Sequence, residues 1–451
     1  MNFIKNNYKS ILKYIGIYLF VCFCYIYLFY FLKFGDSLTF YSFSHAIKNG
    51  QVIYNDLNII TTPLYVIYVS LGLYIYDNHL MFVFEQALLV TIFIYFIRKN
   101  LGVKKTLLLF SLYLFFIRIF LMTYNFLTLL FIIILYYLEK KHSSKDYLIG
   151  IIIGLSILSK HVIGCMLVIP MLIICFRDKK KLFRRLVGIF IPCFIFLIYL
   201  LINKSLYSFI NLCLLGLFDF GSNNTRSTGI YFYLAILIIL VLLFYIFKNK
   251  DKKYLYYLPC VFFFAYPIFD LHHFSYLLFI LLFCLLDNIH FSFGKFENPI
   301  IITLSLFNAL LFLVILSVNF NGNIIRCDNQ GFSLFYTKDA VCKSLKDKAK
   351  SFDKYCSKSK CIIIDGSGMY YKTVKNIKLN YFDVPLYGNF GYDGTNNMIK
   401  KVDKLNNNYF IIGSICTTDN NIYNQCNKKV ADYIIKNKKY VGKDDELLIY
   451  K

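Results

Sequence analysis

Acidic residues are scarce in this chain. Its 451 residues include 25 Asp and Glu against 49 Lys and Arg, and only 16% of all residues are charged while 58% are hydrophobic. Soluble globular domains carry about 25% charged residues. The composition therefore excludes a single soluble globule and indicates a polytopic α-helical membrane protein.

Tryptophan is absent, although the chain has 48 Phe and 40 Tyr. This bias, together with abundant Lys, Asn and Ile, is typical of an AT-rich genome, so the aromatic content alone does not indicate a binding surface. The net charge of +24 does not indicate nucleic-acid binding either. Lys and Arg gather in short loops between apolar spans, where they orient helices in the membrane.

These basic loops predict the topology, because the positive-inside rule assigns them to the cytoplasm. They precede the first span and recur at 98–105, 140–145, 177–185 and 248–253. We expect about 11 transmembrane helices in the plasma (inner) membrane, with a cytoplasmic amino terminus and an extracytoplasmic C-terminal domain. The spans are predicted at about 14–33, 79–97, 105–121, 124–138, 147–159, 162–176, 186–203, 229–247, 254–269, 273–287 and 299–318.

Residues 62–76 are apolar but too short for a span of about 20 residues. A crossing there would also move the basic cluster at 98–105 to the outside. We expect this segment to form an interfacial helix, within one long first outer loop at 34–78. A turn between the short spans at 147–159 and 162–176 would place Lys160 and His161 at the outer tip of that pair.

The composition changes after residue 318, where apolar runs become short. We predict a transmembrane domain at 1–318 and a soluble extracytoplasmic α/β domain at 319–451. Six cysteines of this second domain lie in a compartment predicted to be oxidising, so disulfides are expected, with the pairing left open. These cysteines do not form a CxxC motif with a nearby His, which is the spacing that would indicate a zinc site. Strands are expected at 361–365, 409–413 and 446–450, and helices at 395–405 and 429–438.

Asp36 follows directly after the first span of this acid-poor chain. A carboxylate at the edge of the bilayer is costly to keep, which makes it a candidate for function. Ala46, Gly50 and Tyr54 follow with three residues between each, and Asp56 comes two residues after Tyr54. Thr62-Pro63-Leu64 then opens the interfacial segment.

This layout resembles the first outer loop of GT-C integral-membrane glycosyltransferases, in the branch of protein O-mannosyltransferases and lipid A aminoarabinose transferases. The run from Gly150 through Gly154 and Leu155 to Ser159-Lys160 is similar to a lysine-bearing segment of bacterial members. The resemblance covers about residues 1–320, in layout more than in identities.

The resemblance implies an enzyme that transfers a sugar from a polyprenyl-phosphate-linked donor in the membrane to an acceptor glycan, lipid or protein, generally with inversion. Asp36 would then act as the general base. Lys160, with His161, His272 and His273, would bind the donor phosphate. Asp56 is a candidate second carboxylate. No cofactor is certain, no metal ligand is assigned, and a divalent metal stays open.

Each of these residues also has a structural explanation. Asp36 could solvate a helix end, Lys160 could extend its amine to the interface, and Asp56 could be an ordinary loop acid. His272 and His273 could be interfacial side chains. At the level of function, a transporter or flippase for a lipid-linked saccharide and an O-antigen-type polymerase stay as alternatives. The repeats or broken midplane helices of a transporter are not evident, and a terminal outer domain argues against a polymerase.

Overall fold

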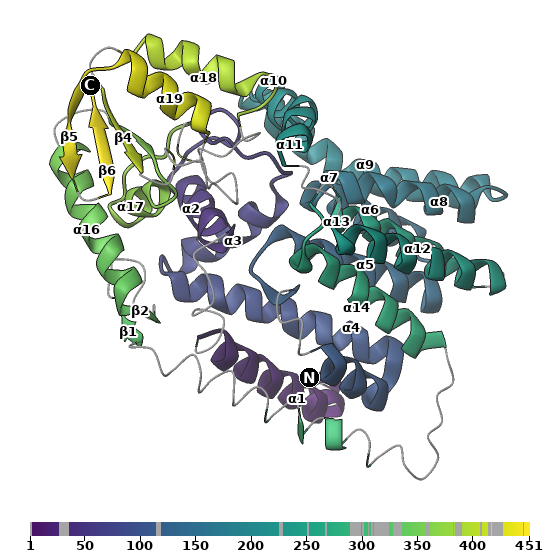
Figure 1. Ribbon diagram of the computed structural model, residues 1–451. Coiled ribbons are helices and arrows are strands. Elements are labelled where there is room, and N and C mark those ends of the chain that lie inside the picture. Colours follow the sequence, from purple (N-terminus) through teal and green to yellow (C-terminus); the bar gives the residue numbers. More distant parts are fainter. Residues whose placement is uncertain are drawn as a thin grey trace. The chain divides into compact units, whose positions relative to one another are not determined.

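The chain divides into two compact units, which are described separately (Figure 1). The first comprises Met1–Lys33, Phe82–Ile195 and Arg226–Gly322, and the second Phe34–Met81, Phe196–Thr225 and Asn323–Lys451. The computed structural model describes residues 2–26, 36–113, 119–224, 229–249, 252–266, 268–288, 324–327, 336–356, 361–381, 390–405, 408–413, 427–444 and 446–451, with a few isolated positions between them.

The first unit is helical. Four helices in the described part of the chain are long and apolar enough to cross a membrane: His79–Ser111, Lys179–Ile202, Ile230–Lys248 and Leu271–Asn288. The chain is therefore a multi-pass membrane protein. Its helices are α1 (Asn2–Cys24), α4 (His79–Tyr113), α5 (Tyr124–Lys141), α6 (Asp146–Ser159), α7 (His161–Met166), α8 (Val168–Cys175), α9 (Lys179–Ile202), α12 (Ile230–Lys248), α13 (Phe262–Ala265) and α14 (Leu271–Asn288).

Breaks between these helices agree with two sequence predictions. Gly102 has a left-handed φ of 78° and interrupts α4, at the basic segment that separates the spans predicted at 79–97 and 105–121. Lys160 has extended backbone between α6 and α7, at the predicted turn. The span predicted at 254–269 is not one continuous α-helix, because Lys253–Val261 forms a 3₁₀ helix (η4) with Pro259 inside it. Most of the span predicted at 299–318 lies outside the described residues.

Helices α6 and α9 pack closely through glycines. A Cβ atom at Gly150 would lie 2.1 Å from the carbonyl oxygen of Arg185, and one at Gly154 would lie 2.5 Å from Cγ of Pro192. Small residues four apart let helix backbones approach in this way. The Gly150 and Gly154 pair therefore fixes the packing of the helix that ends at Lys160.

A buried charge cluster joins four elements of the first unit. Arg185 of α9 has no exposed surface. It donates to both carboxylate oxygens of Glu139 on α5, and its Nε donates to Asp146 on α6 at 3.0 Å. The hydroxyl of Tyr257 on η4 donates to Glu139 at 2.8 Å. The guanidinium is thus compensated by two carboxylates, as a buried cation requires.

The second unit contains the predicted first outer loop, which is largely helical. Helix α2 (Asp36–Lys48) was not predicted, whereas α3 (Leu64–Ile75) begins after Pro63 where an interfacial helix was expected. The segment expected as an outer loop at 203–228 also contains helices: α10 (Leu206–Phe209), the π-helix η3 (Ile210–Leu215) and α11 (Gly216–Asn224).

The C-terminal residues of this unit form a sheet with the strand order β3-β4-β6-β5. Strands β3 (Cys361–Ile364) and β4 (Tyr409–Gly413) are parallel, and β6 (Leu447–Tyr450) is antiparallel to β4 and to β5 (Tyr440–Asp444). The three predicted strands are therefore confirmed. A separate antiparallel pair joins β1 (Ile324–Arg326) and β2 (Tyr336–Lys338).

Helices cover both faces of this sheet (Figure 1). Met398 and Val402 of α18 (Gly394–Asp403) and Ile434 of α19 (Lys428–Asn437) pack on one face. Phe352 of α16 (Asp339–Cys356) and Tyr371 of α17 (Gly368–Val374) pack on the other. Both predicted helices, at 395–405 and 429–438, are present as α18 and α19.

Disulfides occur in the C-terminal residues, as expected. Cys327 is bonded to Cys342, and Cys356 to Cys361. The eight cysteines of the remaining chain are free: Cys22, Cys24, Cys165, Cys175, Cys193, Cys213, Cys260 and Cys284.

Candidate active site

Asp36 is the first residue of α2, in the second unit. The opposite end of α2 is held by Asp77, which accepts a hydrogen bond from Lys48 at 2.7 Å and lies 3.6 Å from His45. Burial lowers the pKa of His45, and the nearby Asp77 opposes that shift.

Aromatic contacts anchor the middle of α2. The Phe40 ring meets Tyr65 of α3 edge-on, with centroids 5.6 Å apart, and Tyr41 meets His79 in the same way at 4.7 Å. Phe40, Tyr41 and Tyr65 are buried. These contacts fix the helix that begins at Asp36.

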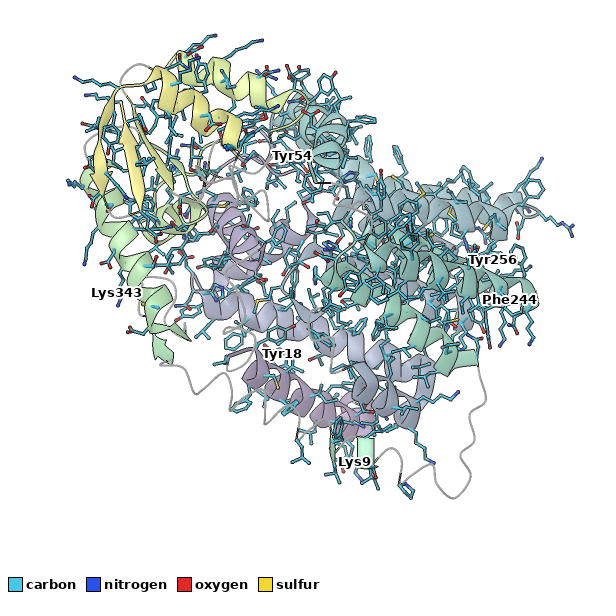
Figure 2. The ribbon with its side chains drawn as sticks, in the orientation of Figure 1. Lys9, Tyr18, Tyr54, Phe244, Tyr256 and Lys343 are labelled. Carbon is cyan, nitrogen blue, oxygen red and sulfur yellow. A yellow bond between two sulfur atoms is a disulfide. The ribbon has the colours of Figure 1, made fainter. Side chains whose placement is uncertain are left out.

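Asp56 closes the loop that follows α2. Its carboxylate accepts a hydrogen bond from the backbone N–H of Val52 at 2.7 Å, and the N–H of Asp56 donates to the Val52 carbonyl at 3.0 Å. Tyr54 (Figure 2) has a left-handed φ of 71°, and its buried hydroxyl donates to the carbonyl of Thr61 at 3.0 Å. This geometry gives Asp56 the contacts of a loop carboxylate.

Lys160 lies in the first unit, and its amine sits among aromatic rings. Its Nζ is 5.1 Å from the ring centroid of Phe264 and 5.8 Å from that of Tyr124. Ser159, the preceding residue, hydrogen-bonds to Thr128 at 2.8 Å and so ties the end of α6 to α5. Among the described residues no carboxylate forms an ion pair with the Lys160 ammonium.

His161 begins α7 directly after Lys160. Both of its ring nitrogens are buried, and neither has a hydrogen-bond partner within the described part of the chain. Buried polar atoms are normally satisfied. The Lys160 and His161 pair thus combines a cation with an imidazole that lacks a described partner.

His272 shares an aromatic pair with Lys160. Phe264 stacks on Tyr276 with centroids 4.6 Å apart and planes 8° from parallel, and the ring of His272 meets Tyr276 edge-on at 5.4 Å. Lys160 contacts the Phe264 ring of the same pair. The structure therefore brings two of the predicted phosphate-binding residues onto one aromatic support.

His273 pairs instead with Asp270. Its Nδ1 lies 2.8 Å from a carboxylate oxygen of Asp270, and its backbone N–H donates to that oxygen at 2.9 Å. Burial alone would raise the pKa of Asp270, but the hydrogen bonds and charge of His273 hold it well below its usual range. Asp270 thereby caps α14 and orients its first turn.

The sequence did not single out Phe264, Tyr276 or Tyr124 as site residues. Each is one ring among 88, from 48 Phe and 40 Tyr, so its type carried no signal. Asp36 and Lys160 belong to different units, and their convergence stays a prediction. The described residues contain no group of three or more His, Cys, Asp or Glu that could hold a metal ion.

Comparison with solved structures identifies the fold. The structure of ArnT from Cupriavidus metallidurans bound to undecaprenyl phosphate superimposes with a TM-score of 0.51 at 12% identity, covering 98% of this chain and 98% of that chain. The chain has a GT-C fold. This confirms the resemblance that the sequence carried.

A second solved structure aligns less closely. The archaeal oligosaccharyltransferase AglB from Archaeoglobus fulgidus, in complex with an inhibitory peptide and a dolichol-phosphate, gives a TM-score of 0.44 at 11% identity over 98% of this chain and 74% of that chain. No protein-family model matches the sequence, and no curated protein matches it.

Proposed function

We propose that this protein is a membrane glycosyltransferase that moves a sugar from a polyprenyl-phosphate-linked donor to an acceptor on the extracytoplasmic face. The observation that carries this proposal is the fold shared with ArnT over 98% of both chains, because the ArnT structure contains undecaprenyl phosphate. The amine of Lys160, with aromatic contacts and no carboxylate partner among the described residues, supports it from within this chain.

In the proposed reaction the acceptor hydroxyl oxygen attacks the anomeric carbon of the donor. The bond between that carbon and the phosphate oxygen breaks, and the phosphate leaves with the electron pair. Attack from the opposite side inverts the anomeric configuration. Asp36 takes the hydroxyl proton as the new bond forms, which is the work of a general base.

Lys160 has the complementary task. Negative charge grows on the departing phosphate in the transition state, and a positioned cation stabilises it. Tyr124 and Phe264 contact the amine, and the adjacent His161 can donate a ring N–H to a phosphate oxygen. His272 contacts the same aromatic pair as Lys160, and it is assigned to the phosphate with them.

Replacing Asp36 with Asn tests the base, because Asn keeps the shape and loses the proton acceptor. We expect turnover with polyprenyl-phosphate-sugar donors in membranes to fall by roughly 100-fold or more, while binding of undecaprenyl phosphate to the purified protein is retained. Asp432→Asn, on the exposed side of α19, removes the same charge and should leave turnover unchanged. Full turnover by Asp36→Asn would disprove the assigned base.

Lys160→Gln tests the phosphate site separately. We expect this change to weaken undecaprenyl phosphate binding as well as turnover, and Lys160→Arg to restore part of both because the positive charge is kept. Binding by Lys160→Gln at the wild-type level would remove Lys160 from the donor site.

A further inference from the structure

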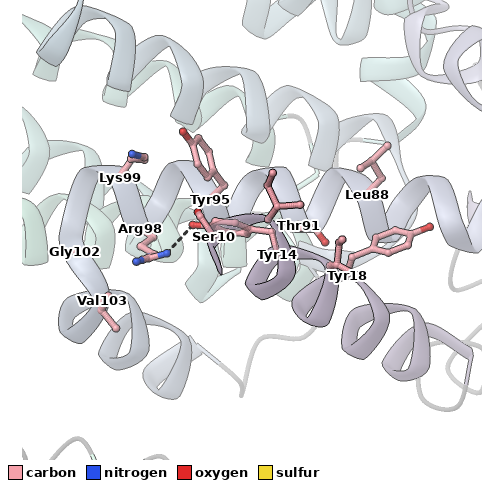
Figure 3. A pocket seen from close by; sticks show the side chains of 12 residues that line it. Ser10, Tyr14, Tyr18, Leu88, Thr91, Tyr95, Arg98, Lys99, Gly102 and Val103 are labelled. Carbon is pink, nitrogen blue, oxygen red and sulfur yellow. Dashed lines mark hydrogen bonds between the residues drawn. The ribbon is translucent and has the colours of Figure 1, made fainter. Parts of the chain in front are cut away.

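A groove lies between α1 and α4, within the first unit (Figure 3). Its volume is about 870 Å³, in the range of about 300–1,000 Å³ that ligand pockets occupy. Apolar side chains such as Ile11, Ile15 and Leu88 line it, and each of them is exposed on the helix surface. No residue given a role in glycosyl transfer above lines this groove.

Two cations mark one end of the groove. Arg98 and Lys99 lie one turn before Gly102, where α4 breaks. The guanidinium of Arg98 donates to the hydroxyl of Tyr14 at 3.0 Å, as the dashed line in Figure 3 shows. The Lys99 amine lies 5.5 Å from the ring centroid of Tyr95. Tyrosines from both helices thus hold the two positive groups at the same end.

Among the described residues, neither Arg98 nor Lys99 forms an ion pair with a carboxylate. Neither Asp nor Glu is among the residues that line the groove. The sequence has neither Asp nor Glu at 1–35 or at 86–138. Arg98 and Lys99 beside an apolar groove are complementary to a molecule with an anionic head and a hydrocarbon tail.

We propose that this groove binds an anionic phospholipid, with the phosphodiester head against Arg98 and Lys99 and an acyl chain along Ile15 and Leu88. Basic pockets between membrane helices bind acidic head groups in this way. The basic loops place this end of the groove at the cytoplasmic leaflet. The bound lipid is therefore a component of the membrane other than the glycosyl donor proposed above.

Native mass spectrometry of the full chain, titrated with phosphatidylglycerol or phosphatidylcholine, tests the proposal. We expect the wild type to prefer phosphatidylglycerol, and the double variant Arg98→Gln with Lys99→Gln to lose roughly 10- to 30-fold in apparent affinity for it, at about 1 kcal/mol per cation near an acidic lipid surface. Affinity for phosphatidylcholine should not change.

The matched control removes two charges from another predicted cytoplasmic cluster. Lys179→Gln with Lys180→Gln alters two exposed lysines at the start of α9, and it should bind phosphatidylglycerol as the wild type does. Equal loss in both double variants, or no loss in the groove variant, would overturn the proposal. Since the readout is lipid binding, the result does not depend on glycosyl transfer.

Discussion

At the scale of single residues, the aromatic support of Lys160 is the feature that the structure adds to the proposed site. The amine of Lys160 makes a cation–π contact with the ring of Phe264, and that ring stacks on Tyr276. Replacing Phe264 with Leu removes a cation–π contact of about 1 kcal/mol and loosens the amine. We expect undecaprenyl phosphate binding to weaken by roughly 5-fold, measured by titration of the purified protein.

Phe263→Leu is the control for that experiment, because the neighbouring ring contacts Phe262 and has no described contact with Lys160. A purely structural role for Phe264 would lower thermal stability without changing affinity in the folded fraction. That outcome would show that Phe264 has no part in binding the phosphate.

Asp270 predicts a pH dependence of stability. Its pKa is depressed in the folded protein by the hydrogen bonds and charge of His273, which outweigh burial. Its ionised carboxylate therefore contributes fully to the free energy of unfolding above the ordinary Asp pKa of about 3.9. This contribution is lost as the pH falls through the lower pKa that Asp270 has in the folded protein. Asp270→Ala also removes the cap of α14, so we expect a loss of about 1 kcal/mol at pH 7.

Thermal unfolding in detergent between pH 3 and pH 7 measures this contribution. The difference between wild type and Asp270→Ala should be largest near neutral pH and shrink in acid, whereas Asp270→Asn should keep most of the cap. A difference that grows in acid would contradict the assignment.

The sequence could indicate charged candidate residues for the proposed site, and it could not indicate the aromatic residues that contact them. Asp36 and Lys160 stood out because ionisable groups are rare and costly in apolar surroundings. Phe264 and Tyr276 did not stand out, because burying an aromatic side chain in a membrane protein has no energetic cost and the chain has many such residues. Only the contacts in the structure point to them, because Phe264 stacks on Tyr276, Phe264 contacts Lys160, and Tyr276 contacts His272.

At the scale of helices, the close packing of α6 on α9 makes a stability prediction. A side chain at Gly154 would meet Pro192 and the carbonyl of Ile189 at less than 3.0 Å. We expect Gly154→Val to destabilise the protein by about 1–3 kcal/mol through overpacking, seen as a lower thermal unfolding temperature. Gly16→Ala is the control, since a Cβ there meets nothing within 4 Å.

The buried charge cluster around Arg185, which joins several helices, gives a second stability prediction. Arg185→Gln leaves Glu139 and Asp146 buried without their cation, and removing one partner of a buried pair costs about 3–5 kcal/mol. We expect little folded protein in membranes. Adding Glu139→Gln and Asp146→Asn to that variant removes both orphaned charges, and folded yield, measured by size-exclusion chromatography, should recover. A triple variant that folds no better would assign the loss to packing.

Hydropathy and charge located the apolar helices and the break at Lys160, because membrane insertion imposes length and loop charge directly. Helix α2 and the 3₁₀ helix η4 were not predicted. Helix α2 mixes polar and aromatic residues without a long apolar run, and η4 is apolar enough to read as a span although Pro259 removes a backbone donor.

At the scale of the whole chain, contacts between remote segments were beyond the sequence. The side chain of Gln51 pairs with the backbone of Leu379 through two hydrogen bonds, of 2.8 and 2.9 Å, across 328 positions. Tyr392 donates its N–H to Asn211 at 3.2 Å. The first loop, the segment at 196–225 and the C-terminal residues therefore form one unit, which no local pattern in any of the three could indicate.

The orientation of the chain in the membrane is the last prediction. The Cys327–Cys342 and Cys356–Cys361 disulfides are typical of an oxidising compartment, and the positive-inside rule predicts that the basic loops lie on the opposite side. Alkaline phosphatase fused after residue 318 should therefore be active, and the same enzyme fused after residue 178 inactive. Fluorescent-protein fusions at both sites should give the reverse pattern, because that reporter folds in the cytoplasm. Activity of the phosphatase only at 178 would invert the topology and move Asp36 to the wrong face for the proposed reaction.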